Sequence, residues 1–275
     1  MERSIGKMKK YLVIGNPIEH SLSPKLHNYW IKKNNIDAGY EKKLIQKGGI
    51  EEMVHEIKGD KINGINVTVP FKKLVIPFLD QLTSRAIMTQ SVNTISKEGD
   101  AIIGDNTDIG GFGLSLKHIN YNLENKKIFI LGAGGVTSSI IMALPAASKI
   151  YLSNRTREKA ENLKKMKLHT NIEIIEWDQI SKNIPDFDMI INTTSLGLKD
   201  NDKIKLDYNK IGTNKLFYDV IYNPSKTNFL TKGEALGNQI ENGKMMFIYQ
   251  AQLAFDLWHG ILPEIDKEII KILDV

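Results

Sequence analysis

The segment GINVTVPFKK, residues 64–73, combines polar side chains with lysines, the residue types that hold a ligand and protonate it. Reading by twos places Ile65, Val67 and Val69 on one face of a predicted strand, and Asn66 and Thr68 on the other. A strand inside a parallel sheet is usually buried on both faces, so these two polar side chains need partners that an apolar layer does not provide. The wall of a ligand pocket would provide them.

A lysine and a carboxylate that could move a proton follow predicted strands in this part of the chain. Pro70 ends the first strand, and Lys72 comes just beyond its carboxyl end, where α/β proteins bind ligands. The segments SVNTI and GDNTDIGG place Asn93 and Asp108 in polar turns after short apolar strands. An ordinary surface lysine and ordinary turn residues are the simpler interpretation of each residue taken alone.

Two serines precede a predicted helix near the N-terminus. The segment HSLSPKLHNYWIKKN, residues 20–34, predicts a helix with Ser23 at the N-cap and Pro24 at the first helical position. Ser21 and Ser23 would then present two hydroxyls beside free backbone N–H groups, which suits a carboxylate. Capping alone also explains Ser23 and leaves only Ser21 without a role. The nearby histidines lack metal-ligand spacing, so we expect no metal site.

A glycine-rich segment, KIFILGAGG at residues 127–135, predicts a nucleotide-binding turn. Residues 128–131 read as a buried parallel strand, and the glycines allow the backbone to turn sharply and approach a pyrophosphate. Thr137 stands where the general dinucleotide fingerprint has its third glycine. By itself the segment is therefore equally compatible with a purely structural turn.

The next predicted strand, KIYLSNRT at residues 149–156, favours NADP over NAD. A carboxylate about 20 residues after the glycines would bind a free ribose 2′-hydroxyl, and none is present. Asn154, Arg155, Thr156 and Lys159 instead offer hydrogen-bond donors and positive charge, which suit a 2′-phosphate. The alternative is that Arg155 and Lys159 are ordinary surface charges at the start of a helix.

The remaining pattern predicts an α/β protein with a parallel sheet. FDMIINTTSLGL and KLFYDVIYNP each read as an apolar strand that runs into a polar or proline-marked turn, and helical stretches alternate with them. Ligands gather at the carboxyl ends of such strands, which is where Thr193 and Tyr222 would lie. The N-terminal third repeats the α/β pattern, because YLVIGNP reads as a strand and turn before the serine-flanked helix.

Composition sets the remaining bounds. The 275 residues, 41% hydrophobic and 25% charged, are enough for two cores, and the lack of cysteine excludes disulfides and thiolate chemistry. The net charge is +5, but the lysines are scattered among acidic residues, so we expect no nucleic-acid partner. The uncharged run at 128–148 is interrupted by glycines and Pro145, so we expect no membrane span. We see no export signal and expect a cytoplasmic protein.

Seven short blocks together carry a family resemblance. In chain order they are GNPIEHSLSPKLHN, NVTVPFKK, SVNT, GDNTD, GAGG, SNRT and YQAQLAFDLWHG. From Tyr11 onward the chain resembles the shikimate dehydrogenase family, NADP-dependent enzymes of aromatic amino-acid biosynthesis. The resemblance implies reversible hydride transfer between NADPH and 3-dehydroshikimate, which gives shikimate.

The same resemblance implies two α/β domains and assigns residues to them. A substrate domain at 1–108 would be completed by C-terminal helices at 245–275, and a Rossmann-like domain at 109–244 would bind NADP on a parallel sheet. Lys72 and Asp108 match the catalytic pair, and Ser21 and Ser23 match the pair that holds the substrate carboxylate. Other positions match ligands of the ring hydroxyls or line the pocket: Asn66, Thr68, Asn93, Tyr222 and Gln250. The predicted cofactor-binding residues are Gly132, Ala133, Gly134, Gly135, Val136, Asn154, Arg155, Thr156, Lys159, Thr193, Val220 and Gly243.

Three alternatives stay open at this point. An NAD-preferring quinate/shikimate dehydrogenase is disfavoured by NRTREK, which lacks an acidic ribose ligand. A catalytically silent relative that senses nucleotide or shikimate would not require Lys72 and Asp108. A nucleic-acid binder is the weakest alternative, and either a monomer or a homodimer is compatible with the sequence.

Overall fold

The computed structural model describes residues 8–182, 184–199 and 201–273. The chain forms two compact units: unit 1 contains the residues up to Thr107 and those from Gln250 onward, and unit 2 is Asp108–Tyr249. The sequence predicts domain boundaries after residues 108 and 244, whereas the units divide after Thr107 and Tyr249. The second division falls inside the helix α8 (Lys244–His259). Residues 1–7, at the start of the predicted substrate domain, lie outside the described residues.

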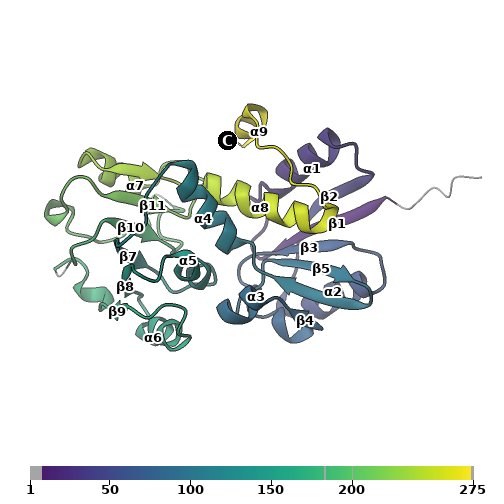
Figure 1. Ribbon diagram of the computed structural model, residues 1–275, viewed down its shortest axis with the longest axis horizontal. Coiled ribbons are helices and arrows are strands. Elements are labelled where there is room, and N and C mark those ends of the chain that lie inside the picture. Colours follow the sequence, from purple (N-terminus) through teal and green to yellow (C-terminus); the bar gives the residue numbers. More distant parts are fainter. Residues whose placement is uncertain (1–7, 183, 200, 274–275) are drawn as a thin grey trace, which may run out of the picture. The chain divides into compact units, whose positions relative to one another are not determined.

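Among the described residues of unit 1, a six-stranded mixed sheet has the order β2-β1-β3-β5-β6-β4 (Figure 1). The strand β1 runs parallel to β2 and β3, and β5 runs antiparallel to β3 and β6. The strands are β1 (Lys9–Gly15), β2 (Ala38–Leu44), β3 (Gly64–Val67), β4 (Gln81–Leu82), β5 (Thr94–Glu98) and β6 (Ala101–Asp105). The helices are α1 (Ser23–Lys33), α2 (Ile50–Lys58), α3 (Ser84–Thr89), α9 (Lys267–Ile272) and part of α8.

Helix α2 shows why the unit 1 core forms. Its buried residues Ile50, Met53, Val54 and Ile57 recur at helical spacing and therefore make one apolar stripe. That stripe belongs to the same buried cluster as the residues of β1, β3, β5 and β6 that point to this face of the sheet. Burying each such side chain stabilises the fold by about 1.5–3 kcal/mol.

The strand β3 is shorter than the sequence predicts. Ile65 and Val67 are buried as expected, but Val69 is 63% exposed and lies outside the strand. The reason is a turn, in which the Phe71 N–H donates to the Thr68 carbonyl at 2.9 Å and carries the chain away from the sheet. The prediction that Val69 belongs to the strand, on the same face as Ile65 and Val67, is therefore wrong.

Within its described residues, unit 2 contains a six-stranded parallel sheet with the order β12-β11-β10-β7-β8-β9. Figure 1 labels β11, β10, β7, β8 and β9 along this sheet. This order corresponds to the doubly wound Rossmann arrangement, whose topological switch point lies between β7 and β10. The strands are β7 (Lys127–Leu131), β8 (Lys149–Ser153), β9 (Ile172–Ile174), β10 (Met189–Asn192), β11 (Leu216–Asp219) and β12 (Gln239–Glu241). The helices are α4 (Asp108–His118), α5 (Thr137–Ala143), α6 (Arg157–Lys165), α7 (Asn228–Ala235) and the start of α8.

Alternate residues of the unit 2 strands enter different cores. Ile128 and Ile130 belong to a cluster that includes residues of α4, α5 and α6, whereas Phe129 and Leu131 belong to a cluster that includes residues of α7. A strand that is apolar on both faces is typical of a parallel sheet covered by helices. The predicted α/β fold is confirmed, and so is the strand, turn and short helix at 128–148. No helix in the described part of the chain could span a membrane.

Candidate functional site

The glycine-rich loop lies at the carboxyl end of β7, next to the end of β10. Gly132 has φ +111°, and a Cβ there would lie 2.5 Å from the Thr193 hydroxyl oxygen. Both the backbone conformation and the close approach therefore require glycine. The loop and Thr193 thus lie at the topological switch point, where doubly wound folds bind nucleotides.

Several backbone amides of this loop donate hydrogen bonds to other groups of the protein. The Gly132 N–H donates to the Ser153 carbonyl at 2.8 Å, and the Ala133 N–H donates to the Asn154 side-chain oxygen at 3.0 Å. The Asn154 amide in turn donates to the Thr156 carbonyl at 2.8 Å. Asn154, which stays a predicted cofactor ligand, therefore also holds the glycine loop against the end of β8. Val136 is the N-cap residue of α5.

Three predicted 2′-phosphate ligands lie on the surface beyond β8. Arg155, Thr156 and Lys159 are all exposed, at the end of β8 and in the first turn of α6. Arg157 pairs with Glu161 at 2.9 Å and also with Glu176. In the described part of the chain neither Arg155 nor Lys159 forms such an ion pair, so both charges are available to an anionic ligand.

The residues after β11 form a second part of the unit 2 site. A Cβ at Gly243 would lie 2.1 Å from the Val220 carbonyl oxygen, so only glycine permits this approach. The Gly243 N–H donates to the Ile221 carbonyl at 3.1 Å, and the Tyr222 ring stacks on Phe247 with 4.7 Å between ring centroids. The predicted residues Val220, Tyr222 and Gly243 therefore lie together.

A buried carboxylate, Asp219, precedes Val220 at the end of β11. Burial raises its pKa to about 6. Three donors oppose this effect: the Thr227 hydroxyl at 2.7 Å, the Ile221 N–H at 3.0 Å and the Asn192 amide at 3.0 Å. Asp219 therefore joins the end of β10, the segment after β11 and the residue before α7 by hydrogen bonds. It has no role in the predicted chemistry.

In unit 1, Ser23 is not the helix cap that the sequence predicts. Helix α1 begins at Ser23, its N-cap residue is Leu22, and no side chain caps it. The buried Ser23 hydroxyl is hydrogen-bonded to the Tyr40 hydroxyl instead. The Ser23 N–H approaches the Ser21 hydroxyl oxygen at 3.4 Å. Capping therefore does not explain these two serines, which stand next to each other at the start of the helix.

The polar face of β3 meets other polar groups of the protein. The Tyr40 hydroxyl donates to the Asn66 side-chain oxygen at 2.6 Å. The Asn66 amide donates to the Asn93 carbonyl at 3.1 Å and to the Thr94 hydroxyl at 3.2 Å. Asn66 is buried, so these bonds provide the partners that its place in the sheet requires.

Asn93 joins this network to the C-terminal part of unit 1. Its side-chain oxygen accepts from the Thr107 N–H at 2.8 Å, and its amide donates to the Gln250 side-chain oxygen at 3.2 Å. Asn93 directly precedes β5 and follows α3, so the prediction that it follows a short strand is wrong. The error arose because α3 is only six residues long and has no clear helical period.

Thr68 and Lys72 lie in the turn that follows β3, and both are half-buried. The Lys72 carbonyl accepts from the Val92 N–H at 2.8 Å, which places Lys72 beside the segment that contains Asn93. Unit 1 thus brings together a set of predicted residues: Ser21, Ser23, Asn66, Thr68, Lys72, Asn93 and Gln250. Asp108 is the first residue of α4 in unit 2 and is nearly fully buried.

Sequence reasoning missed the residues that hold the predicted ones in place. Tyr40 and Thr94 complete the Asn66 network, and Thr137 accepts a hydrogen bond from the Gly134 N–H at 3.0 Å. No sequence signal identified Tyr40, because an aromatic residue in a strand is ordinary. Among the described residues, no group of acidic or histidine side chains could hold a metal ion.

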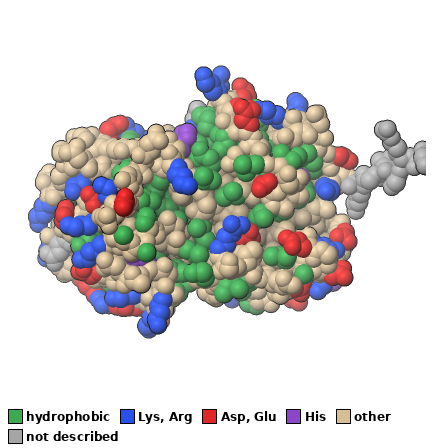
Figure 2. Space-filling model, in the orientation of Figure 1, with side chains coloured by type: hydrophobic (Ala, Val, Ile, Leu, Met, Phe, Trp, Pro, Cys, Tyr) green, Lys and Arg blue, Asp and Glu red, His purple; other side chains and the backbone are tan. Residues whose placement is uncertain are grey.

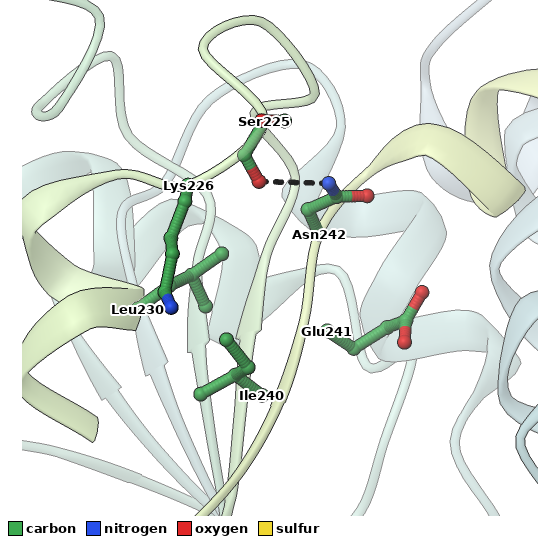
Figure 3. A pocket seen from close by; sticks show the side chains of 6 residues that line it. All are labelled: Ser225, Lys226, Leu230, Ile240, Glu241 and Asn242. Carbon is green, nitrogen blue, oxygen red and sulfur yellow. Dashed lines mark hydrogen bonds between the residues drawn. The ribbon is translucent and has the colours of Figure 1, made fainter. Parts of the chain in front are cut away.

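Unit 2 also has a surface hollow that is lined by other residues than the predicted site. Its volume is about 320 Å³, and Figure 3 shows its lining, in which the Asn242 amide donates to the Ser225 carbonyl at 2.8 Å. The Lys226 ammonium beside it pairs with Glu234. None of the predicted site residues lines this hollow.

Charges on the visible face are mixed. Figure 2 shows lysines and arginines interspersed with acidic side chains. Many of the lysines form ion pairs, for example Lys127 with Asp186 at 2.7 Å and Lys149 with Glu173 at 3.1 Å. Pairing of this kind is typical of a solvated surface.

Comparison with protein families gives two matches, one in each unit. Residues 13–95 match the family described as the shikimate dehydrogenase substrate binding domain. Residues 114–204 match the family described as shikimate / quinate 5-dehydrogenase. Together the matches cover more than half of the chain.

Individual relatives extend over almost the whole chain. A shikimate dehydrogenase (NADP(+)) of Pelagibacter ubique is 59% identical over 269 residues, which cover 97% of this chain and 99% of the relative. A shikimate dehydrogenase (NADP(+)) of Staphylococcus haemolyticus is 38% identical and covers 93% of this chain and 94% of its own. The crystal structure of shikimate 5-dehydrogenase from Thermus thermophilus, in complex with NADP(H) and shikimate, has a TM-score of 0.85 at 26% identity, covering 97% of this chain and 98% of that one.

Proposed function

The chain belongs to the shikimate dehydrogenase family, and we propose that it catalyses the reversible NADPH-dependent reduction of 3-dehydroshikimate to shikimate. It is an NADP-dependent oxidoreductase of the shikimate pathway. The observation that carries this proposal is the similarity to the shikimate dehydrogenase (NADP(+)) of Pelagibacter ubique, which is 59% identical over almost the full length of both chains. The unit 1 network and the unit 2 glycine loop are compatible with this activity.

The reaction adds a hydride to the carbonyl carbon of the substrate and a proton to its oxygen. NADPH, when bound, would supply the hydride and become NADP⁺. Negative charge develops on the substrate oxygen during this step, and a lysine ammonium can neutralise it by donating a proton. We assign this role to Lys72, which the turn after β3 presents at the end of the strand. Asp108 accepts a hydrogen bond from the substrate hydroxyl and orients it.

The proposed substrate ligands fall into two groups by their surroundings. Ser21, Thr68 and Gln250 are half-buried, which allows them to contact a ligand directly. Asn66 and Asn93 are buried and already hydrogen-bonded to other residues of the network. We propose that the first group binds the carboxylate and ring hydroxyls, with Ser23 and Tyr222, and that the two asparagines hold the pocket in shape.

The residues at the end of β8 fit NADP. Arg155 and Lys159 form no ion pair with any residue that the structure describes, and no carboxylate follows β8 where a free 2′-hydroxyl would need one. Arg155 can form a bidentate pair with a phosphate, which a 2′-hydroxyl cannot offer. The glycine loop would receive the pyrophosphate, and Val220 and Gly243 would lie at the nicotinamide end.

We further propose that no nucleic acid binds, because many of the surface lysines are paired with acidic side chains. The enzyme acts as a monomer or a homodimer. Its location is cytoplasmic, where NADPH-dependent biosynthesis takes place. These three statements depend on the proposed activity.

The experiment measures initial rates with shikimate and with quinate, each with NADP⁺ and with NAD⁺, by the absorbance of the reduced nicotinamide. We expect turnover of shikimate with NADP⁺ to exceed all other combinations. A preference for NAD⁺ or for quinate would identify the quinate/shikimate dehydrogenase alternative. A folded protein that binds NADPH but turns over neither substrate would identify the silent sensor.

A further inference from the structure

A continuous chain of hydrogen bonds connects the glycine loop to the end of β7, the strand that precedes it. The Gly134 N–H lies 3.0 Å from the Thr137 hydroxyl oxygen, and this oxygen lies 2.9 Å from the Thr193 hydroxyl oxygen. The Thr193 oxygen lies 2.8 Å from the carbonyl oxygen of Leu131, the last residue of β7. Only Gly132 and Ala133 separate Leu131 from Gly134 along the backbone, so these hydrogen bonds close a small ring around the loop.

The direction of each bond in this ring is fixed. A carbonyl oxygen can only accept, so the Thr193 proton points to Leu131. Thr193 therefore accepts from Thr137, and the Thr137 proton is used in that bond. A backbone N–H can only donate, so the Gly134 N–H donates to the remaining lone pairs of the Thr137 oxygen. Each hydroxyl thus donates once and accepts once.

The ring is buried and closely packed. The side chain of Thr137 is fully buried and that of Thr193 is 7% exposed, so water does not compete well for these groups. The missing Cβ of Gly132 leaves the room in which the Thr193 hydroxyl sits. A glycine at 137, as in the general dinucleotide fingerprint, would provide no hydroxyl, and Gly134 would lose its acceptor.

We propose that Thr137 is a positioning residue for the cofactor: its hydroxyl fixes the glycine loop in the conformation that receives the pyrophosphate. This inference rests on the proposed function, because it takes NADP as the ligand of the loop. Thr137 does not contact the 2′-phosphate region after β8, so it acts on the part that NADP and NAD share. An ordered loop loses less conformational entropy when it binds, which strengthens binding.

The test compares Thr137→Val with Thr137→Ser. Valine keeps the branched shape and removes the hydroxyl, whereas serine restores the hydroxyl. Isothermal titration calorimetry measures the Kd for NADP⁺ and for NAD⁺ without any turnover. We expect Thr137→Val to weaken both ligands by the same factor, about five- to tenfold. We expect Thr137→Ser to bind both within about twofold of the parent protein.

A matched control removes another buried hydroxyl of unit 2. The Ser115 hydroxyl is fully buried and bonds to Tyr218 and to the Phe112 carbonyl, both at 2.8 Å. Ser115→Ala should lower the melting temperature and leave both Kd values unchanged. This control separates a loss of general stability from a loss of loop order.

Three results would overturn the inference. They are an unchanged or tighter Kd in Thr137→Val, a Thr137→Ser variant as weak as the valine variant, and a loss confined to NADP⁺. A parent protein that does not bind NADP⁺ would instead refute the proposed function. The two failures are therefore distinguishable in one set of titrations.

Discussion

We predict that the protein loses stability in mild acid because the buried His27 side chain resists protonation. The side chain is 1% exposed, its ring stacks on Tyr40 with 4.2 Å between centroids, and the edge of Trp30 lies against it at 5.9 Å. Among the described residues, neither ring nitrogen has a hydrogen-bond partner. Burial lowers the pKa of His27 to about 3, and His259 adds to the effect. The ring is therefore neutral in the folded protein at neutral pH.

The sign and size of the effect follow from the two protonation states. The folded pKa of His27, about 3, lies below its ordinary value of 6.5, so the unfolded chain takes up the proton first. The contribution to stability is complete above pH 6.5 and is lost as the pH falls toward 3. Between pH 7 and pH 5, His27 alone should lower the free energy of unfolding by about 2 kcal/mol.

The assay is urea unfolding at pH 7 and at pH 5, for the parent protein and for His27→Phe. Phenylalanine keeps an aromatic ring against Tyr40 and cannot take up a proton. Tryptophan fluorescence is suitable because Trp30 and Trp258 both lie against His27. We expect the free energy of unfolding of His27→Phe to fall by about 2 kcal/mol less than that of the parent between the two pH values.

Asp219, which lies in unit 2, does not disturb this comparison. Asp219 has a pKa raised to about 6, so its contribution to stability grows as the pH falls and opposes that of His27. It is unchanged in His27→Phe, and its effect therefore cancels in the difference between the two proteins. If the parent and His27→Phe lose stability in parallel, the reasoning about a neutral buried His27 is refuted.

Three further predictions concern catalysis, cofactor choice and pH. Lys72→Ala should lower kcat by about a hundredfold or more while the KM for shikimate changes little, with exposed Lys73→Ala as control; equal changes in kcat and KM would contradict a transition-state role. Arg155→Gln should weaken NADP⁺ binding by about tenfold and leave NAD⁺ unchanged, whereas Arg157→Gln should change neither, and calorimetry distinguishes them. As the pH falls from 7 to 5, protonation of Asp219 should raise the free energy of unfolding by about 1 kcal/mol, and urea unfolding should show that this gain is absent from Asp219→Asn. An unaltered pH dependence in the variant would mean that Asp219 stays charged.

Local patterns in the sequence predicted the fold and the glycine turn at the proposed cofactor site. The apolar strand at 128–131 and the glycines after it predict a strand and a tight turn, and the structure contains both. These features depend on backbone conformation and on the alternation of side chains, which neighbouring residues specify. The positive charge after β8 was visible for the same reason, because Arg155 and Lys159 follow directly on a predictable strand.

The polar network of unit 1 could not be predicted from the sequence. Ser23 matched a helix cap, but the helix begins at Ser23 itself and the Ser23 hydroxyl bonds to Tyr40. The polar face of β3 indicated a ligand pocket, and nothing in the sequence showed that Asn66 bonds to Tyr40 and Thr94. Both hydroxyl and amide groups have several possible partners, and only the folded chain selects among them.

Thr137 shows the same division between sequence and structure. The sequence by itself predicted a tight glycine turn in which a threonine stands where the dinucleotide fingerprint has its third glycine. Only the tertiary structure decided what that threonine does, because its partner Thr193 is 56 residues away and reaches it through the pairing of β10 with β7. Backbone geometry is local and can be read from neighbouring residues, whereas a hydrogen bond between distant side chains exists only once the sheet has formed.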